Sequence, residues 1–219
     1  MSVIQKQSIV KQEYWLIRWI WYVLGMMIFS LGLATMIKYP ELGLEPWSAA
    51  HVALSHYAFS IGTWTAIIQT AFLCSIFFVS KRKIKPGTWC SLLLEGSLID
   101  FYLHYITFPE INHKIAYFIG ILMVSFGAAM LLRSHVGAGA KTQFYWVFSK
   151  YKQVSIWKMK ALCEVIAIGI ALLGHSHIGI GTFIYACLSG IFIQLLHHQL
   201  ERFSHVRLFT YLQRSKARL

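Results

Sequence analysis

Residues 46–59 of the chain are PWSAAHVALSHYAF, and this apolar stretch decides how the rest of the sequence is arranged. Its 14 residues are fewer than the roughly 20 that an α-helix needs to cross a ~30 Å hydrocarbon layer. A second stretch, AKTQFYWVFSK at residues 140–150, is shorter still. We therefore predict that both segments are short helices that do not cross a membrane.

Six longer apolar runs surround these two segments, and each is long enough to cross. They cover residues 15–37, 63–80, 88–106, 115–132, 156–173 and 182–198. Only 13% of the residues are charged, against about 25% in a typical soluble domain. The sequence therefore predicts an all-α membrane protein with about six transmembrane helices and the lipid bilayer as its surroundings.

The basic residues predict the orientation of these helices. If the two short segments do not cross, one side of the membrane receives the N-terminus, the loop 81–85, the basic residues between 133 and 158, and the tail. The other side keeps only Lys38 and Lys114. The positive-inside rule then puts both ends of the chain in the cytoplasm. The net charge of +12 does not indicate nucleic-acid binding, since the basic residues flank apolar runs instead of forming one folded patch.

An internal repeat with an offset of 94 residues organises the chain. It relates Gly43 to Gly137, the pair Gly87-Thr88 to Gly181-Thr182, and Gly96 to Gly190. Each unit contains a span, a short segment and two further spans. Because three crossings is an odd number, the second unit is predicted to lie inverted in the membrane, a common design in transporters.

The predicted division of the chain follows from this repeat. Five parts are expected: a cytoplasmic N-terminus (1–14), a first membrane repeat (15–106), an external loop (107–113), a second membrane repeat (114–198) and a basic amphipathic cytoplasmic tail (199–219). The tail carries apolar residues at three-residue spacing among arginines, as a helix on an anionic membrane surface would. A basic tail that serves only to fix topology remains the alternative.

Several motifs resemble those of the YczE/YyaS/YitT group of bacterial membrane proteins. The family pattern G-x-G-P-W-D is similar to Gly43-Leu44-Glu45-Pro46-Trp47-Ser48, and G-x-G-P-R-D is similar to Gly137-Ala138-Gly139-Ala140-Lys141-Thr142. Gly-Thr helix starts at 87–88 and 181–182 also fit, so the resemblance covers about residues 25 to 198. It implies a multi-pass protein of the bacterial plasma (inner) membrane, and it suggests transport.

This chain departs from the family pattern at several of those positions. Glu45 replaces a glycine, and Ala140 and Lys141 replace the proline and arginine of the second copy. Ser48 and Thr142 stand where the pattern has aspartates. Any function that the aspartates carry in the family must therefore be lost or rebuilt here.

The segment around Gly137 and Gly139 is a candidate anion site, because glycines let backbone N–H groups converge at a helix N-terminus. Lys141 in the first helical turn would add a full positive charge. The alternative is a sharp turn at the membrane surface with Lys141 among lipid headgroups. The residues predicted to bind the substrate are Gly43, Pro46, Trp47, Ser48, Gly137, Gly139, Lys141 and Thr142.

Three acidic residues fall within the predicted spans: Glu95, Glu164 and Asp100. A carboxylate in hydrocarbon costs at least ~2.5 kcal/mol, so such residues face the protein interior and are candidates for carrying ions or protons. We assign ion or proton coupling to all three. The alternative is a carboxyl group that hydrogen-bonds a neighbouring helix.

The favoured function is a secondary transporter or exporter of a small solute, for which an anion is one candidate. The alternative is a membrane accessory or scaffold protein that transports nothing, in which the polar residues only join the helices. Neither a catalytic motif nor a metal-ligand spacing occurs, so no enzyme activity, metal or cofactor is expected. The sequence leaves the oligomeric state open.

Overall fold

The computed structural model describes residues 3–79, 84–137 and 139–216, with backbone alone for residues 3–14, 146, 156–157 and 201–216. Lys81, Arg82 and Lys83, which contribute to the predicted orientation, lie outside the described residues. Within these ranges all regular secondary structure is helical, and no strand is found. The elements are α1 (Val3–Lys38), η1 (Pro40–Leu42), α2 (Pro46–Ser55), α3 (Ile61–Val79), α4 (Pro86–Tyr105), α5 (His113–Ser134), α6 (Ala140–Lys152), α7 (Ile156–Leu173) and α8 (Ile180–Lys216).

The prediction of an all-helical membrane protein is confirmed. Among the residues that the structure describes, four helical stretches are long and apolar enough to cross a membrane, namely 15–38, 61–79, 113–134 and 180–200. Helices α4 and α7 are 20 and 18 residues long and carry charged residues in their interiors. Large apolar side chains cover the outside, and Phe78 and Leu173 are 84% and 81% exposed. A water-soluble protein rarely exposes apolar surface on this scale.

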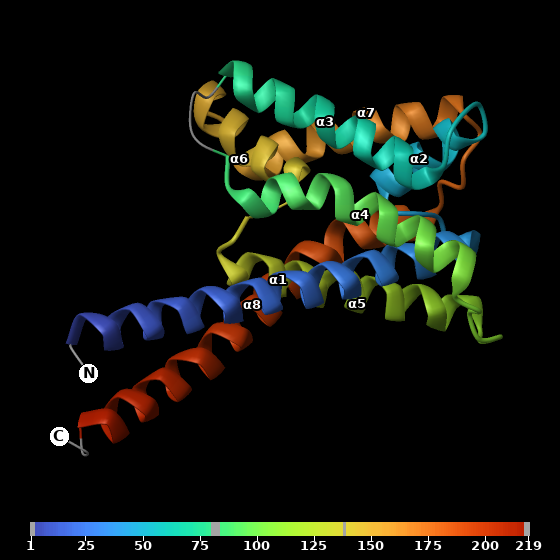
Figure 1. Ribbon diagram of the computed structural model, residues 1–219. Helices are drawn as coiled ribbons and strands as arrows, with labels where there is room; N and C mark the ends of the chain where they lie inside the picture. The colour runs from blue at the N-terminus through green and yellow to red at the C-terminus, as the bar shows by residue number, and fades with distance from the viewer. Residues whose placement is uncertain (1–2, 80–83, 138, 217–219) are drawn as a thin grey trace.

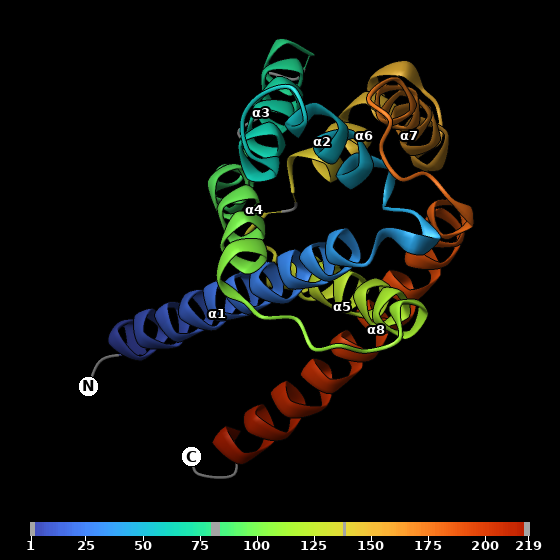
Figure 2. The same cartoon turned by 90° about the vertical axis from the view of Figure 1, so that its right-hand side faces the viewer.

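The helices form two layers joined by α4 (Figure 1). Helices α1, α5 and α8 pack in one layer, and α3 and α7 lie in the other with the short helices α2 and α6. Helix α4 packs against both α1 and α3. The two ends of the chain leave the bundle at the same end (Figures 1 and 2). Helix α8 continues without a break to Lys216, so the basic tail extends the last long helix.

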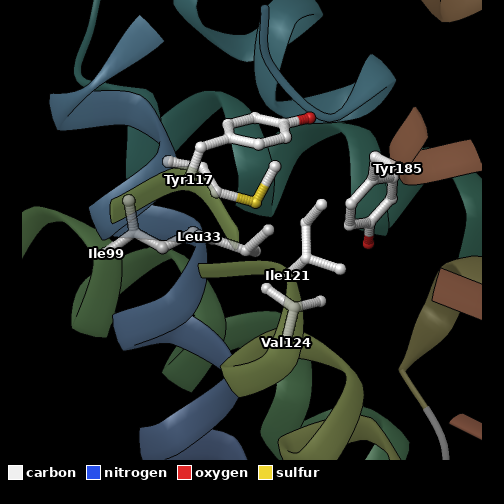
Figure 3. Packing of buried hydrophobic residues seen from close by; sticks show 7 residues of the cluster. Leu33, Ile99, Tyr117, Ile121, Val124 and Tyr185 are labelled. Atoms are coloured by element: carbon white, nitrogen blue, oxygen red, sulfur yellow. The ribbon is translucent and has the colours of Figure 1, made fainter. Parts of the chain in front are cut away.

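Helices α1 and α5 cross closely because glycines face each other. A Cβ atom at Gly127 would lie 2.5 Å from the backbone nitrogen of Phe29, and one at Gly32 would lie 2.9 Å from the carbonyl oxygen of Gly120. Small residues of this kind let membrane helices approach through their backbones. Beside this crossing, a buried apolar cluster from α1, α4, α5 and α8 fills the space between the helices (Figure 3). It contains Leu33, Met36, Ile99, Tyr117, Ile121, Val124 and Tyr185.

Replacing Gly127 with alanine should lower the free energy of unfolding by about 1–3 kcal/mol, because the added methyl group overpacks the crossing. Gly169 in α7 is a matched control, since, apart from its chain neighbours and the backbone of its own helix, no atom of the described residues lies within 4 Å of the position that a Cβ atom would take there. At Gly169, alanine should be neutral or stabilising, because it favours helix over glycine. Thermal unfolding in detergent, followed by tryptophan fluorescence, measures both. Equal effects at the two positions would contradict the close crossing.

The helix starts recur at a nearly constant offset. Helices α2, α3 and α4 begin at 46, 61 and 86, and α6, α7 and α8 begin at 140, 156 and 180, giving differences of 94, 95 and 94. Packing recurs too: α1 packs on α4 as α5 does on α8, and α2 packs on α7 as α6 does on α3. One pair breaks the pattern. Helices α3 and α4 pack closely, whereas α7 and α8 have no comparable packing in the described part of the chain.

Each glycine-containing loop packs against the start of a helix from the other half of the chain. Gly43 has a positive φ of 102°, and a side chain there would collide with the backbone of Gly179 and with Thr182. A Cβ atom at Gly137 would lie 2.6 Å from the backbone nitrogen of Thr88. The two halves therefore hold each other's loops at the starts of α8 and α4.

Candidate functional site

The two short helices meet through their N-terminal halves. The indole nitrogen of Trp47, in the first turn of α2, donates to the hydroxyl oxygen of Tyr145 in α6 at 3.0 Å. From this meeting point the two helices run to opposite sides of their layer (Figure 1), and Ala53 of α2 lies against Gly174, after the end of α7. Both positive helix ends therefore point to the same interior region.

Glu45 supplies a carboxylate to the first of these helix ends. It is the N-cap of α2, ahead of Pro46, and only 5% of it is exposed. Its Oε2 atom accepts hydrogen bonds from the backbone nitrogen of Ser48 at 2.6 Å and from the Ser48 hydroxyl at 2.9 Å. A carboxylate at this position satisfies the free N–H groups and complements the helix dipole. Glu45 is therefore firmly held.

Glu95 supplies a carboxylate to the second helix end, although it comes from α4. Its Oε1 atom lies 3.7 Å from the Lys141 ammonium in the first turn of α6. Its Oε2 atom would lie 3.9 Å from a Cβ atom at Gly139, the N-cap residue, which has no side-chain cap of its own. Glu95 is 3% exposed. An internal carboxylate thus occupies the place where the sequence predicts an anion.

Unpartnered polar atoms surround this pair. Among the described residues, the Oε1 atom of Glu95, the Nε2 atom of Gln69 and the Nε2 atom of His51 are buried without a hydrogen-bond partner. Gln69 interacts with the Glu95 carboxylate, and His51 is joined through its other ring nitrogen to Thr65 at 3.1 Å. Buried polar atoms nearly always have partners. The region is therefore suited to hold a further polar group.

A second ion pair lies beside the centre, on α7. The carboxylate of Glu164 is 3.3 Å from the Lys160 ammonium one turn earlier, and Glu164 also interacts electrostatically with Lys141. Lys141 thus attracts three carboxylates, those of Glu45, Glu95 and Glu164. It is the residue on which the charge balance of the interior depends.

The structure brings only part of the predicted site together. Lys141, Trp47, Ser48 and Pro46 lie at or beside the meeting point of α2 and α6, with Gly139 next to Glu95. Gly43 and Gly137 lie in the loops that pack on α8 and α4, where they serve the fold. Thr142 is exposed.

Asp100 has a structural partner instead of a place at the centre. Its Oδ1 atom accepts from the backbone nitrogen of Gly62 at 2.8 Å, and its Oδ2 atom accepts from the Ser60 hydroxyl. Asp100 therefore caps the start of α3 and joins it to α4. This geometry favours the alternative in which an acidic residue only holds two helices together.

Asp100→Asn should lower the free energy of unfolding by about 1–2 kcal/mol, because the amide replaces one of the two accepting oxygens with a donor. Ser97→Ala on the same helix is a control, since Ser97 is exposed and bonds only its own helix in the described structure. That change should stay within about 0.5 kcal/mol. Chemical unfolding in detergent compares the two. An Asp100→Asn protein as stable as the wild type would remove the capping role.

Sequence reasoning missed several residues of the centre. The sequence singles out Glu45 only as a departure from the family pattern, although an acidic residue directly before a proline is typical of a helix start. Gln69 and Tyr145 are not among the residues that the sequence predicts for the site. No local pattern distinguishes these two residues, because their neighbours come from other helices. The structure contains no group of three metal-ligating side chains among the residues it describes.

Buried charges, apolar exposed helices and paired short helices define the chain as an all-helical integral membrane protein. The chain belongs to the family of unknown function DUF6198, whose model matches residues 16–198. It is similar to the uncharacterised membrane protein YczE of Bacillus subtilis, with 24% identity over 206 residues that cover 88% of this chain and 94% of the relative. These matches confirm the resemblance inferred from the sequence motifs.

Two further relatives cover nearly the same span. The uncharacterised protein YyaS of Bacillus subtilis is 23% identical over 192 residues, which are 84% of this chain and 94% of the relative. An uncharacterised protein of Haemophilus influenzae is 20% identical over 213 residues, 92% of this chain and 97% of the relative. No solved structure gives a significant match.

Proposed function

We propose that this protein is a secondary transporter or exporter of a small solute in the bacterial plasma membrane, without enzyme activity. The observation that carries the proposal is the meeting of two short helices, N-terminus to N-terminus, around buried charges. Transporters bind substrates at broken helices of this kind near the middle of the bilayer. Charged residues inside a membrane domain are costly, and they mark the paths of solutes and protons.

The proposed architecture has six crossings in two inverted repeats, with both ends in the cytoplasm. Helix α2 has 10 residues and is about 15 Å long at 1.5 Å per residue, half the thickness of a ~30 Å hydrocarbon layer. The recurring helix starts and the exchanged loops around Gly43 and Gly137 support a twofold relation between the halves. Two short helices that enter from opposite sides would then meet at mid-depth.

Alternating access follows from this architecture as a movement of one layer against the other. Helices α2, α3, α6 and α7 carry most of the central residues, while α1, α5 and α8 form the other layer. Helix α4 carries Glu95 and packs between them. The solute would be exposed to one side and then the other, with Glu95 and Glu164 as the coupling groups.

The decisive experiment is solute uptake into proteoliposomes, with and without a pH gradient. A panel of radiolabelled small carboxylates, phosphate, amines and amino acids covers the solute classes. Uptake of one class above that of protein-free liposomes, inhibited by unlabelled solute, supports the proposal. A purified and folded protein that moves none of them in either direction would support the scaffold alternative.

The inverted arrangement predicts opposite labelling at two related positions. Tyr57 and Tyr151, exposed near the ends of α2 and α6, are separated by the repeat offset of 94. In a variant lacking the four native cysteines, Tyr57→Cys should react with an impermeant maleimide added outside whole cells, and Tyr151→Cys should react only after permeabilisation. Labelling of both from the same side would exclude the inverted repeats.

A further inference from the structure

We propose that the side chain of Glu95 occupies the binding site of a small carboxylate solute when the solute is absent. Protonation of Glu95 then frees this site for the solute. The proposal rests on the transport function above and names its substrate class. The place is the N-terminus of α6, bounded by Lys141, Gly139 and Gln69.

The groups around this place are suited to an anion. The Lys141 ammonium can only donate, the first N–H groups of α6 have no side-chain cap, and the amide nitrogen of Gln69, which interacts with the Glu95 carboxylate, is also a donor. A helix N-terminus with a neighbouring lysine attracts negative charge. Because the site already holds the carboxylate of Glu95, we expect the carboxylate of a small solute to fit it as well.

Glu95 is held less firmly than Glu45, by its interactions with Lys141 and Gln69. Its Oε1 atom is 3.7 Å from the Lys141 ammonium, beyond hydrogen-bond distance, and has no hydrogen-bond partner among the described residues. Glu45 is fixed to Ser48 by bonds of 2.6 and 2.9 Å. Of the two carboxylates at the two helix ends, Glu95 is the one that can be replaced.

Charge balance explains why a proton is needed. The carboxylates of Glu45, Glu95 and Glu164 already outnumber the ammonium groups of Lys141 and Lys160, so an anion added while Glu95 is ionised would bring further unpaired negative charge into the interior. When Glu95 takes up one proton, the anion restores the same balance, so one proton and one carboxylate enter together. The ionisable groups facing Glu95 are Lys141 of α6, Glu45 before α2 and Tyr22 of α1; from α3 it faces the uncharged amide of Gln69.

The test is acetate binding by the full-length protein in detergent at pH 7.5, followed as thermal stabilisation over an acetate titration. Chloride salt replaces acetate at constant ionic strength. Glu95→Gln should bind acetate at least about tenfold more tightly than the wild type, because the competing carboxylate is gone. Asp100→Asn is the matched control for loss of an acidic residue and should bind as the wild type does. In the wild type, binding should strengthen as the pH falls to 6.

Lys141→Met alone can fail to fold, so the double variant Glu95→Gln/Lys141→Met tests the role of the lysine. It should lose the tight acetate binding of Glu95→Gln. Unchanged acetate affinity in Glu95→Gln, or stabilisation of the wild type by methylammonium instead of acetate, would overturn the proposal. Because binding is measured without transport, acetate binding with no uptake in proteoliposomes would refute the transport function and leave the anion site standing.

Discussion

Replacing Lys141 with methionine should lower the free energy of unfolding by about 3–5 kcal/mol, the usual cost of removing one partner from a buried ion pair. Lys141 is the ammonium that attracts Glu45, Glu95 and Glu164 together. Without it, buried carboxylates are left in a region of low dielectric constant with no compensating cation. Thermal and chemical unfolding of the purified protein in detergent measures the loss.

Two further variants separate this effect from loss of packing. Adding Glu95→Gln to Lys141→Met should restore part of the lost stability, because one of the uncompensated charges is removed with its partner. Lys160→Met removes the other lysine of the region. Lys160 is one third exposed and pairs with Glu164 along one helix, so its loss should cost about 0.5 kcal/mol or less. Equal costs for the two lysines would contradict a central role for Lys141.

Glu95→Gln should abolish proton-driven accumulation of the solute while the protein stays folded. A gradient of one pH unit is worth 1.36 kcal/mol for one proton and supports about tenfold accumulation of a solute that moves with it. Because a glutamine carries no titratable proton, the accumulation ratio of the variant should fall to one. Exchange of labelled for unlabelled solute should continue, since Lys141 and the N-terminus of α6 remain. Uptake into proteoliposomes with an imposed pH gradient measures both activities.

Asp100→Asn is again the control, because it removes an acidic residue from the same helix while leaving the centre intact. Its accumulation ratio should equal that of the wild type at a temperature where it is folded. If Glu95→Gln accumulates solute as the wild type does, Glu95 does not couple the proton. If Glu95→Gln loses exchange as well, the residue is needed for binding and not only for coupling.

The sequence alone determined the helical and membrane character of the protein. Run lengths and low charge predicted long apolar helices, and the residues of α2 and α6 were expected at 46–59 and 140–150, where helices 46–55 and 140–152 are found. These features are local, because the length and polarity of a segment decide whether it suits a bilayer. The motifs around Gly43 and Gly137 likewise placed the chain in its family.

The tertiary structure alone decided which charges meet. Glu95 and Lys141 are 46 residues apart in the chain, and Glu45 belongs to the other short helix. No spacing rule joins them, since their proximity depends on the loops that each half of the chain packs against the other. Asp100 and Glu95 look alike in sequence, as acidic residues of one helix, yet Asp100 caps α3 and Glu95 faces α6. A helix presents different faces to different neighbours, and only the packing assigns each face its partner.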